Sequence, residues 1–190
     1  ADSETAMTTS ETYKGEVTTP VVTAIMSRTF YTGVKGEEVA DYTHNMKLGA
    51  SVETIKTTSF YFYQAGYLRA TDVTVTSEDA MTKSMTYKGT LTSVDPLAIM
   101  SETFYKGEKG YEIADYTFNH KFGTPTIKTT SFYFYSGSRA DSADSETAMT
   151  TSETYKGEVT IPVVTAIMSR TFYTGVKGEE VADYNHNMKL

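Results

Sequence analysis

The feature that most constrains this chain is an internal repeat, in which residues Ala1–Leu48 recur as Ala143–Leu190. Self-similarity at a fixed spacing is typical of proteins that stack one supersecondary unit several times. The repeat therefore predicts a modular architecture. The two copies differ at two positions only, which are Thr19 against Ile161 and Thr43 against Asn185.

A diverged copy of the same unit lies between these two similar segments. The stretch "AIMSRTFYTGVKGEEVADYT" at Ala24–Thr43 aligns with "AIMSETFYKGEKGYEIADYT" at Ala98–Thr117. The stretch "IKTTSFYFY" occurs letter for letter at Ile55–Tyr63 and at Ile127–Tyr135. The repeating unit is thus about 71 residues long. We predict three modules, which are module A at 1–72, module B at 73–142 and a partial module A′ at 143–190.

Module A′ ends at Leu190, whereas module A continues from the equivalent Leu48 towards the aromatic stretch. Two explanations are open. The sequence is a piece of a longer array, or A′ supplies strands that complete another module in the same chain or in a neighbour. A β-module of about 71 residues is marginal in size, because small domains bury little of their surface. We therefore expect modules A and B to share one core.

The residue pattern favours strands throughout the chain. Thr, Tyr, Val and Phe are enriched in β-strands, and no segment shows a helical period with capping residues. Paired glycines in "TGVKGE" (Thr32–Glu37) and "KGEKGY" (Lys106–Tyr111) suit short hairpin loops. The spacing of these turn signals predicts about four strands per module. We predict an all-β protein that forms an antiparallel sandwich or a closed barrel.

Alternation along two of the predicted strands assigns their faces, because successive side chains point to opposite sides. In Ile55–Tyr63 the phenylalanines share one face, which we expect to point inward, and the tyrosines share the other. In Glu38–Leu48 one face is mainly apolar, and we predict that it faces the core. Its members are Ala40, Tyr42, His44, Met46 and Leu48.

Composition and missing motifs narrow the class of function. The net charge is −7 without a run of Lys or Arg, so nucleic acid is not an expected partner. The absence of Cys removes disulfides and Cys-bound zinc. The apolar stretches are too short for a membrane-spanning helix. The chain has no nucleophile elbow, phosphate-binding loop or dinucleotide-binding motif. We predict a protein that is not an enzyme and needs no cofactor.

The histidines lie on predicted strands and have two alternative roles. His44 and Met46 offer soft ligand atoms two positions apart, and Phe118 and His120 take their places in module B. Two such ligands are too few for a metal site, so ordinary packing in the core is the alternative. The residues that we predict to line a ligand site are Tyr42, His44, Met46, Tyr116, Phe118 and His120.

Acidic residues at the junction of modules B and A′ form a weak calcium candidate. Asp141, Asp144 and Glu146 lie within "ADSADSE". Calcium is bound by six to eight oxygen atoms on a tight loop, and Asp and Glu carboxylates are common ligands. A solvated turn is the alternative interpretation of this segment.

Four tyrosines are the main candidates for a binding or assembly surface, and they are Tyr61, Tyr63, Tyr133 and Tyr135. Exposed aromatic side chains on a sheet stack on sugar rings or pack against a neighbouring chain. The segment "TTSFYFY" also has the composition of a strand that pairs with itself, since it is uncharged and lacks Pro. If a second sheet covers these tyrosines, they belong to an ordinary core instead.

These features favour a structural or adhesive protein that lies outside the cell or on its surface. We expect a filament or fibre subunit that assembles with itself through strand edges and tyrosine surfaces. One alternative is a multivalent glycan-binding repeat protein with the tyrosines as stacking platforms. Another is an eight-stranded barrel that carries a small apolar ligand.

Overall fold

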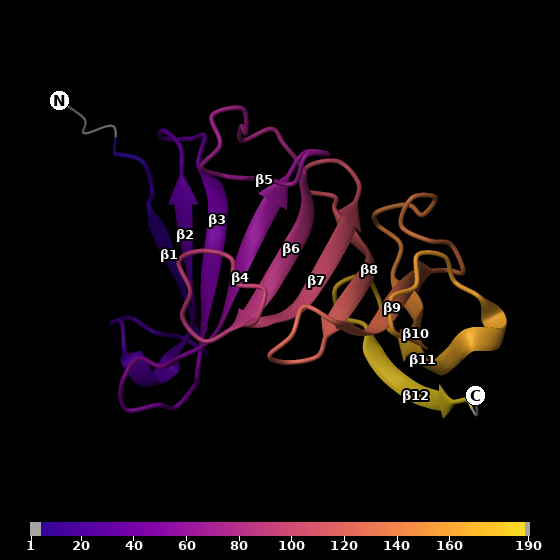
Figure 1. Cartoon of the computed structure of the whole chain (residues 1–190). Coiled ribbons are helices and arrows are strands. Elements are labelled where there is room, and N and C mark those ends of the chain that lie inside the picture. Colours follow the sequence, from indigo (N-terminus) through magenta and orange to yellow (C-terminus); the bar gives the residue numbers. More distant parts are fainter. Residues whose placement is uncertain (1–4, 189–190) are drawn as a thin grey trace. The chain divides into compact units, whose positions relative to one another are not determined.

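The computed structural model describes residues 5–188, which belong to two compact units, Ala1–Ile99 and Met100–Leu190. Both units consist of antiparallel strands joined by turns and loops (Figure 1), and two helical turns of three residues are the only helices in the described part. The prediction of an all-β protein is therefore confirmed.

The predicted modules 1–72, 73–142 and 143–190 do not follow the division between the two units, and they stay predictions. Residues 1–4 of module A and residues 189–190 of module A′ lie outside the described residues.

The first unit contains one sheet with the strand order β1-β2-β3-β4-β6, in which the short β5 pairs with β4. Each neighbouring pair in this order is antiparallel. The elements are β1 (Thr9–Tyr13), the helical turn η1 (Val22–Ala24), β2 (Ile25–Thr32), β3 (Val39–Met46), β4 (Ile55–Tyr63), β5 (Leu68–Arg69) and β6 (Met81–Lys88).

The second unit contains six strands in the order β7-β8-β9-β10-β11-β12, again antiparallel. Its elements are β7 (Ile99–Lys106), β8 (Ile113–His120), β9 (Ile127–Tyr135), β10 (Met149–Lys156), the helical turn η2 (Val164–Ala166), β11 (Ile167–Thr174) and β12 (Val181–Asn187). The first residue of β7, Ile99, is the last residue of the first unit.

The prediction of a sandwich or a closed barrel is wrong. A sandwich packs two sheets face to face, and a barrel joins its first strand to its last. Among the described residues, β1 pairs only with β2 and β12 pairs only with β11, so the sheet of each unit is open. Within each unit the described strands form a single sheet, so burial must come from the strands and loops of that unit.

A row of aromatic rings across neighbouring strands provides much of this burial. In the first unit, ring centroids are 4.4 Å apart for Phe30 and Tyr42, 5.7 Å for Tyr42 and Phe60, and 5.6 Å for Phe60 and Tyr87. Cross-strand aromatic pairs of this kind stabilise a sheet. Phe60 lies inside the row and is fully buried. The second unit has the same arrangement with Phe104, Tyr116, Phe132 and Tyr155.

The tyrosine face of β4 and β9 is covered by the loop that follows each strand. Val39, Tyr63 and Ala70 form one buried cluster, and Ala70 comes from the loop between β4 and β6. The second unit has an equivalent cluster, with Ala140 in the loop between β9 and β10. Both faces of β4 and β9 are therefore covered in part, one by aromatic neighbours and the other by a loop.

A β-bulge in β3 changes the predicted assignment of its faces. Consecutive residues of β2 face Tyr42 and Ala40, so Asp41 is an extra residue in β3. Val39 is 7 % exposed although alternation predicts it on the solvent face, and Leu48 is 45 % exposed although alternation predicts it in the core. Asp41 and Thr43, which alternation also predicts on the solvent face, are each 6 % exposed. The predicted division into a core face and a solvent face is therefore wrong, because β3 has neighbours on both faces.

The hairpin loop between β2 and β3 requires glycine at its first position. Gly33 has a φ of +113°, and a Cβ atom there would lie 2.4 Å from the backbone oxygen of Glu37. No other residue type fits this space. Gly107 and Gly175 take the same conformation in the corresponding hairpins of the second unit.

Candidate functional site at the open sheet edges

The first candidate site consists of two strands, which we call the edge strands. They are β1, the first strand in the order of the first unit, and β12, the last strand in the order of the second unit. An edge strand presents a row of unpaired backbone N–H and C=O groups to its surroundings. Each edge strand has a close sequence copy elsewhere in the molecule that is paired on both sides. The chain therefore shows the same residues with and without a partner strand.

The edge strand β12 repeats β3 with one difference, Asn185 in place of Thr43. β3 lies between β2 and β4, and β12 lies beside β11 alone. All seven residues of β12 are exposed, whereas β3 is mostly buried. The difference is largest at the first position, where Val39 is 7 % exposed and Val181 is 66 % exposed.

The cover of β3 comes from β4 and from the loop that follows β4. Tyr63 donates a hydrogen bond from its hydroxyl to the backbone oxygen of Ala40 at 2.6 Å. Arg69 forms an ion pair with the buried Asp41 at 2.7 Å, and its guanidinium lies 4.2 Å from the ring centroid of Phe60. β4 supplies a backbone partner and an apolar cover, and Arg69 of the short β5 that follows it supplies the countercharge. The equivalent Asp183 on β12 is exposed.

The edge strand β1 belongs to "MTTSETYK", which recurs unchanged as β10. β10 lies between β9 and β11, and there Tyr155 is fully buried and Glu153 is 8 % exposed. The same residues on β1 are more accessible, because Tyr13 is half-buried and Glu11 is exposed. The ring of Phe132 on β9, 5.5 Å from that of Tyr155, accounts for much of this difference.

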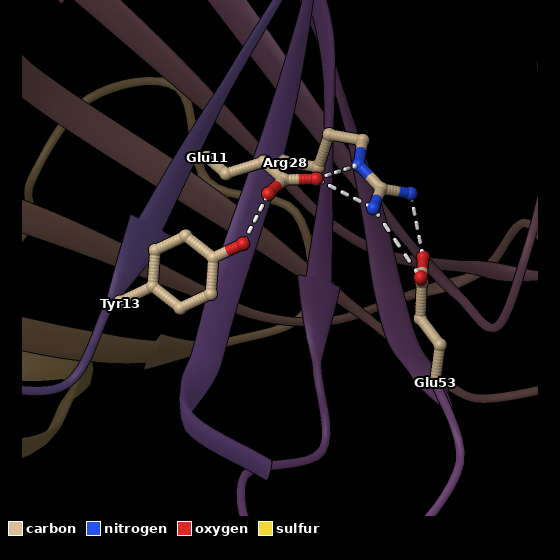
Figure 2. Close-up of polar contacts among 4 residues, drawn as sticks. All are labelled: Glu11, Tyr13, Arg28 and Glu53. Atoms are coloured by element: carbon tan, nitrogen blue, oxygen red, sulfur yellow. Dashed lines mark hydrogen bonds and ion pairs between the residues drawn. The ribbon is translucent and has the colours of Figure 1, made fainter. Parts of the chain in front are cut away.

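Four polar side chains cross the surface of the first sheet next to β1, as Figure 2 shows. Arg28 donates from Nε to Glu11 at 2.7 Å and from Nη1 to Glu53 at 2.6 Å. Tyr13 donates its hydroxyl hydrogen to the other oxygen of Glu11. Arg28 is therefore shared between the two carboxylates, which leaves this cluster with an excess of negative charge.

These contacts also change the ionisation of the groups involved. The hydrogen bonds from Tyr13 and from Arg28 hold the pKa of the Glu11 carboxyl below its usual value. The bond to Glu11 raises the pKa of the Tyr13 hydroxyl. At the buried copy, burial and the bond to Glu153 raise the pKa of Tyr155. The same cluster thus exists in an exposed and a buried form.

The structure places the four predicted surface tyrosines in partly or fully buried positions. Tyr63 and Tyr135 are each 7 % exposed, and Tyr61 and Tyr133 are half-buried. Tyr61 and Tyr133 donate hydrogen bonds to the hydroxyl oxygens of threonines on the neighbouring strand, at 2.8 Å and 3.0 Å. Stacking on a sugar needs an exposed ring face, so this burial gives no support to a glycan platform.

A cleft of about 320 Å³ in the second unit does involve two of these tyrosines. Tyr133 and Tyr135 contribute to its lining together with Lys177 and Glu180. A larger cleft of about 540 Å³ in the first unit lies beside Val39 and the loop that covers it, and neither Tyr61 nor Tyr63 lines that cleft. The two tyrosine pairs therefore do not form equivalent pockets.

Four of the six residues predicted to line a ligand site lie in the aromatic rows or pack against them. Tyr42 and Tyr116 are members of the rows, and His44 and Phe118 each pack against them. Burial lowers the pKa of His44. His120 lies 3.0 Å from a carboxylate oxygen of Glu102, and Met46 is buried. None of the six lines either of the two clefts described above.

The predicted calcium ligands lie in a turn. Asp144 accepts a hydrogen bond from the backbone N–H of Glu146 at 2.9 Å, and Asp141 accepts one from the Ser142 hydroxyl at 3.2 Å. Within residues 5–188, no three acidic, His or Cys side chains are grouped so that they could hold a metal ion. The geometry therefore gives the calcium hypothesis no support.

Sequence reasoning did not identify the arginines that cover the aromatic rows. Arg69 and Arg139 each pair with a buried aspartate, at 2.7 Å and 2.6 Å, and each lies above a phenylalanine of the row. A signal was available, because an Arg-Ala dipeptide follows both copies of "IKTTSFYFY". Each arginine lies far along the chain from its aspartate partner, so the sequence did not indicate the contact.

No family model, curated protein or solved structure matches this chain. Among the residues that the structure describes, no helix has the length and apolar character that a bilayer span requires.

Proposed function

We propose that this chain is a structural protein that assembles with other copies through its edge strands β1 and β12. The observation that carries the proposal is the exposure of β12, whose sequence is buried where it recurs as β3. Residues that pack against a neighbouring strand in one place and are exposed in another are suited to receive such a neighbour. Strand addition to an open edge is a known route of assembly.

The composition of β12 supports this proposal. Natural proteins protect exposed edges with Lys, Pro or bulges that prevent pairing with another chain. β12 has no Lys and no Pro, and its one acidic residue, Asp183, is the extra residue of a bulge. The same bulge at Asp41 does not prevent β3 from pairing with β4. Val181 and Tyr184 on this strand are 66 % and 48 % exposed. The edge thus combines unpaired backbone with exposed apolar side chains, which favours association.

The two other functions suggested by the sequence have less support. A barrel around an apolar ligand requires a closed sheet, and no pairing among the described strands closes the sheet in either unit. A glycan-binding repeat requires accessible and equivalent tyrosine platforms, and two of the four tyrosines are 7 % exposed. The lack of catalysis and a location outside the cell or at its surface remain parts of our proposal, which activity screens and surface labelling would test.

Sedimentation velocity over a series of protein concentrations tests the proposal. We expect the mean mass of the native chain to rise with concentration. The variant Val181→Lys adds a charge to the edge and should reduce this rise strongly. Val73→Lys is the matched control, because Val73 is 99 % exposed in a loop, and it should behave like the native chain. A monomer at every concentration, or equal effects of the two variants, would contradict the proposal.

A further inference from the structure

We infer that the two edge strands are complementary to one and the same strand, an extended segment with the β4 sequence "IKTTSFYFY" donated by a neighbouring chain. Bound between β12 of one copy and β1 of the next, this segment would join the copies end to end. The inference deepens the proposed function and rests on it, because it names the partner that the edges recognise.

The pairing of β3 with β4 defines how the segment would lie on β12. In that pair, Phe60 faces Tyr42, Ser59 faces Thr43 and Thr58 faces His44. β8 and β9 pair in the same register. Because β12 repeats β3, the segment would place its first phenylalanine opposite Tyr184 and its second threonine opposite His186. Both residues are exposed at present.

The single difference between the two strands preserves the polar contact at this position. Thr43 accepts a hydrogen bond from the hydroxyl of Tyr61 at 2.8 Å. Asn185 stands at this place in β12, and its amide nitrogen donates to Thr171 at 2.7 Å. An amide also carries an oxygen acceptor. The tyrosine of an incoming segment would therefore still find an acceptor at this position.

The other edge of the same segment fits β1. On β9, Phe132 faces Glu153 and Thr130 faces Tyr155 of β10, and the rings of Phe132 and Tyr155 lie 5.5 Å apart. β1 has the same sequence as β10. An added segment would therefore bring its phenylalanine against Tyr13, which is the contact that buries Tyr155.

A second polar contact makes the fit to β1 specific. The hydroxyl of Thr58 donates to the backbone oxygen of Gly89 at 2.8 Å and accepts from the N–H of Leu91 at 3.1 Å. Thr130 makes the same two bonds with Gly157 and Val159, at 2.8 Å and 3.0 Å. Both threonines are fully buried. In the first unit the turn after β6 thus holds a threonine of β4, and in the second unit the turn after β10 holds a threonine of β9.

The glycine in the turn after β1 has the same left-handed conformation as the glycine in each of the two turns that hold this threonine. Gly15 has a φ of +74°, compared with +77° for Gly89 and +70° for Gly157. The segment would therefore donate to the Gly15 oxygen and accept from the N–H of Val17. A receptor that is formed before binding loses less conformational entropy when the partner arrives.

A synthetic peptide with the sequence of Glu53–Ala70 tests the inference, because it includes the strand and the Arg-Ala pair that would cover Asp183 and Val181. The protein is kept dilute enough to be monomeric. We expect fluorescence anisotropy to show binding at least about tenfold tighter than for a scrambled peptide. Sedimentation should show linear multimers at equimolar peptide, with the peptide alone as a control for its own aggregation.

Two variants separate the two edges. With Val181→Lys in the protein, the peptide should bind only at β1, so complexes should stay at one protein per peptide. A peptide with Thr58→Val lacks the hydroxyl that the Gly15 turn holds, so it should bind β12 and form no multimers. Equal binding of the scrambled peptide, or peptide binding that never joins two copies, would overturn the inference.

The outcomes also distinguish this inference from the proposed function. The native chain could stay monomeric at every concentration while the matching peptide joins it into multimers. This result would support the inference of a bridging strand and contradict the proposal that the chain assembles alone. If the chain assembles alone and the matching peptide changes neither anisotropy nor mass, the inference fails and the proposed function stands.

Discussion

The strands β3 and β12 share their sequence at all but one of seven positions, yet one is mostly buried and the other is exposed along its whole length. The strands β10 and β1 show the same contrast, with Tyr155 fully buried and Tyr13 half-buried. Burial in these open sheets is therefore determined by the neighbouring strand. The side chains of a strand in such a sheet become buried only where a neighbouring strand and its side chains cover them.

The largest expected effect compares Tyr155→Ala with Tyr13→Ala. Truncation of a large buried side chain costs about 3–5 kcal/mol, and Tyr155 is fully buried against Phe132. Tyr13 lies on an edge strand, where substitutions usually change stability by less than about 1 kcal/mol. Urea denaturation followed by circular dichroism measures both. Similar losses in the free energy of unfolding for the two substitutions would contradict the difference in burial between β10 and β1.

The second-largest expected loss of stability concerns the ion pair between Arg69 and Asp41. Arg69→Ala leaves the buried Asp41 without its countercharge and removes the guanidinium above Phe60, so we expect a loss of about 2–4 kcal/mol. The double variant with Asp41→Asn should recover part of this loss. On the edge strand, Asp183→Asn should change the free energy of unfolding by less than about 0.5 kcal/mol. An equal cost for Asp183→Asn and Asp41→Asn would show that β12 is covered in solution.

A smaller effect is expected from the matched pair Val39→Ala and Val181→Ala. Val39 is 7 % exposed within a cluster that includes Tyr63, so its truncation should cost about 2 kcal/mol. Val181 is 66 % exposed, and its truncation should cost less than about 0.5 kcal/mol at low protein concentration. At a concentration where chains associate, the loss in the free energy of unfolding caused by Val181→Ala should rise. It should then approach the loss caused by Val39→Ala.

The smallest expected effect is a loss of stability at alkaline pH. Burial raises the pKa of Tyr135 to about 12 from an ordinary value of 10.0. The folded state therefore holds this proton more tightly than the unfolded state does. Its contribution is complete below pH 10 and is lost as the pH rises towards about 12. Urea midpoints at pH 9 and pH 11 should fall less for Tyr135→Phe than for the native chain, and an unchanged slope would contradict this assignment.

Much of the local structure could be predicted from the sequence. The alternation and the turn glycines predicted strands and hairpins, because these signals act over a few residues. The same alternation placed Val39 on the solvent face, which is wrong. Val39 is buried by Tyr63 and Ala70, which lie far along the chain.

The number of sheet layers could not be predicted, for a related reason. The sequence predicted covered phenylalanines in β4, and Phe60 is indeed buried. It could not show that neighbouring rings and Arg69 provide the cover in place of a second sheet. The edge site was missed because β12 and β3 look alike in sequence, and only the strand order distinguishes them.

Amide hydrogen exchange on the dilute monomer tests the central claim most directly, since it compares β3 and β12 within one molecule. We expect the amides of β3 that bond to β4 to exchange slowly, and their counterparts on β12 to exchange at least about a hundredfold faster. Equal protection of the two strands in the monomer would show that β12 already has a partner, and it would contradict the open-edge account.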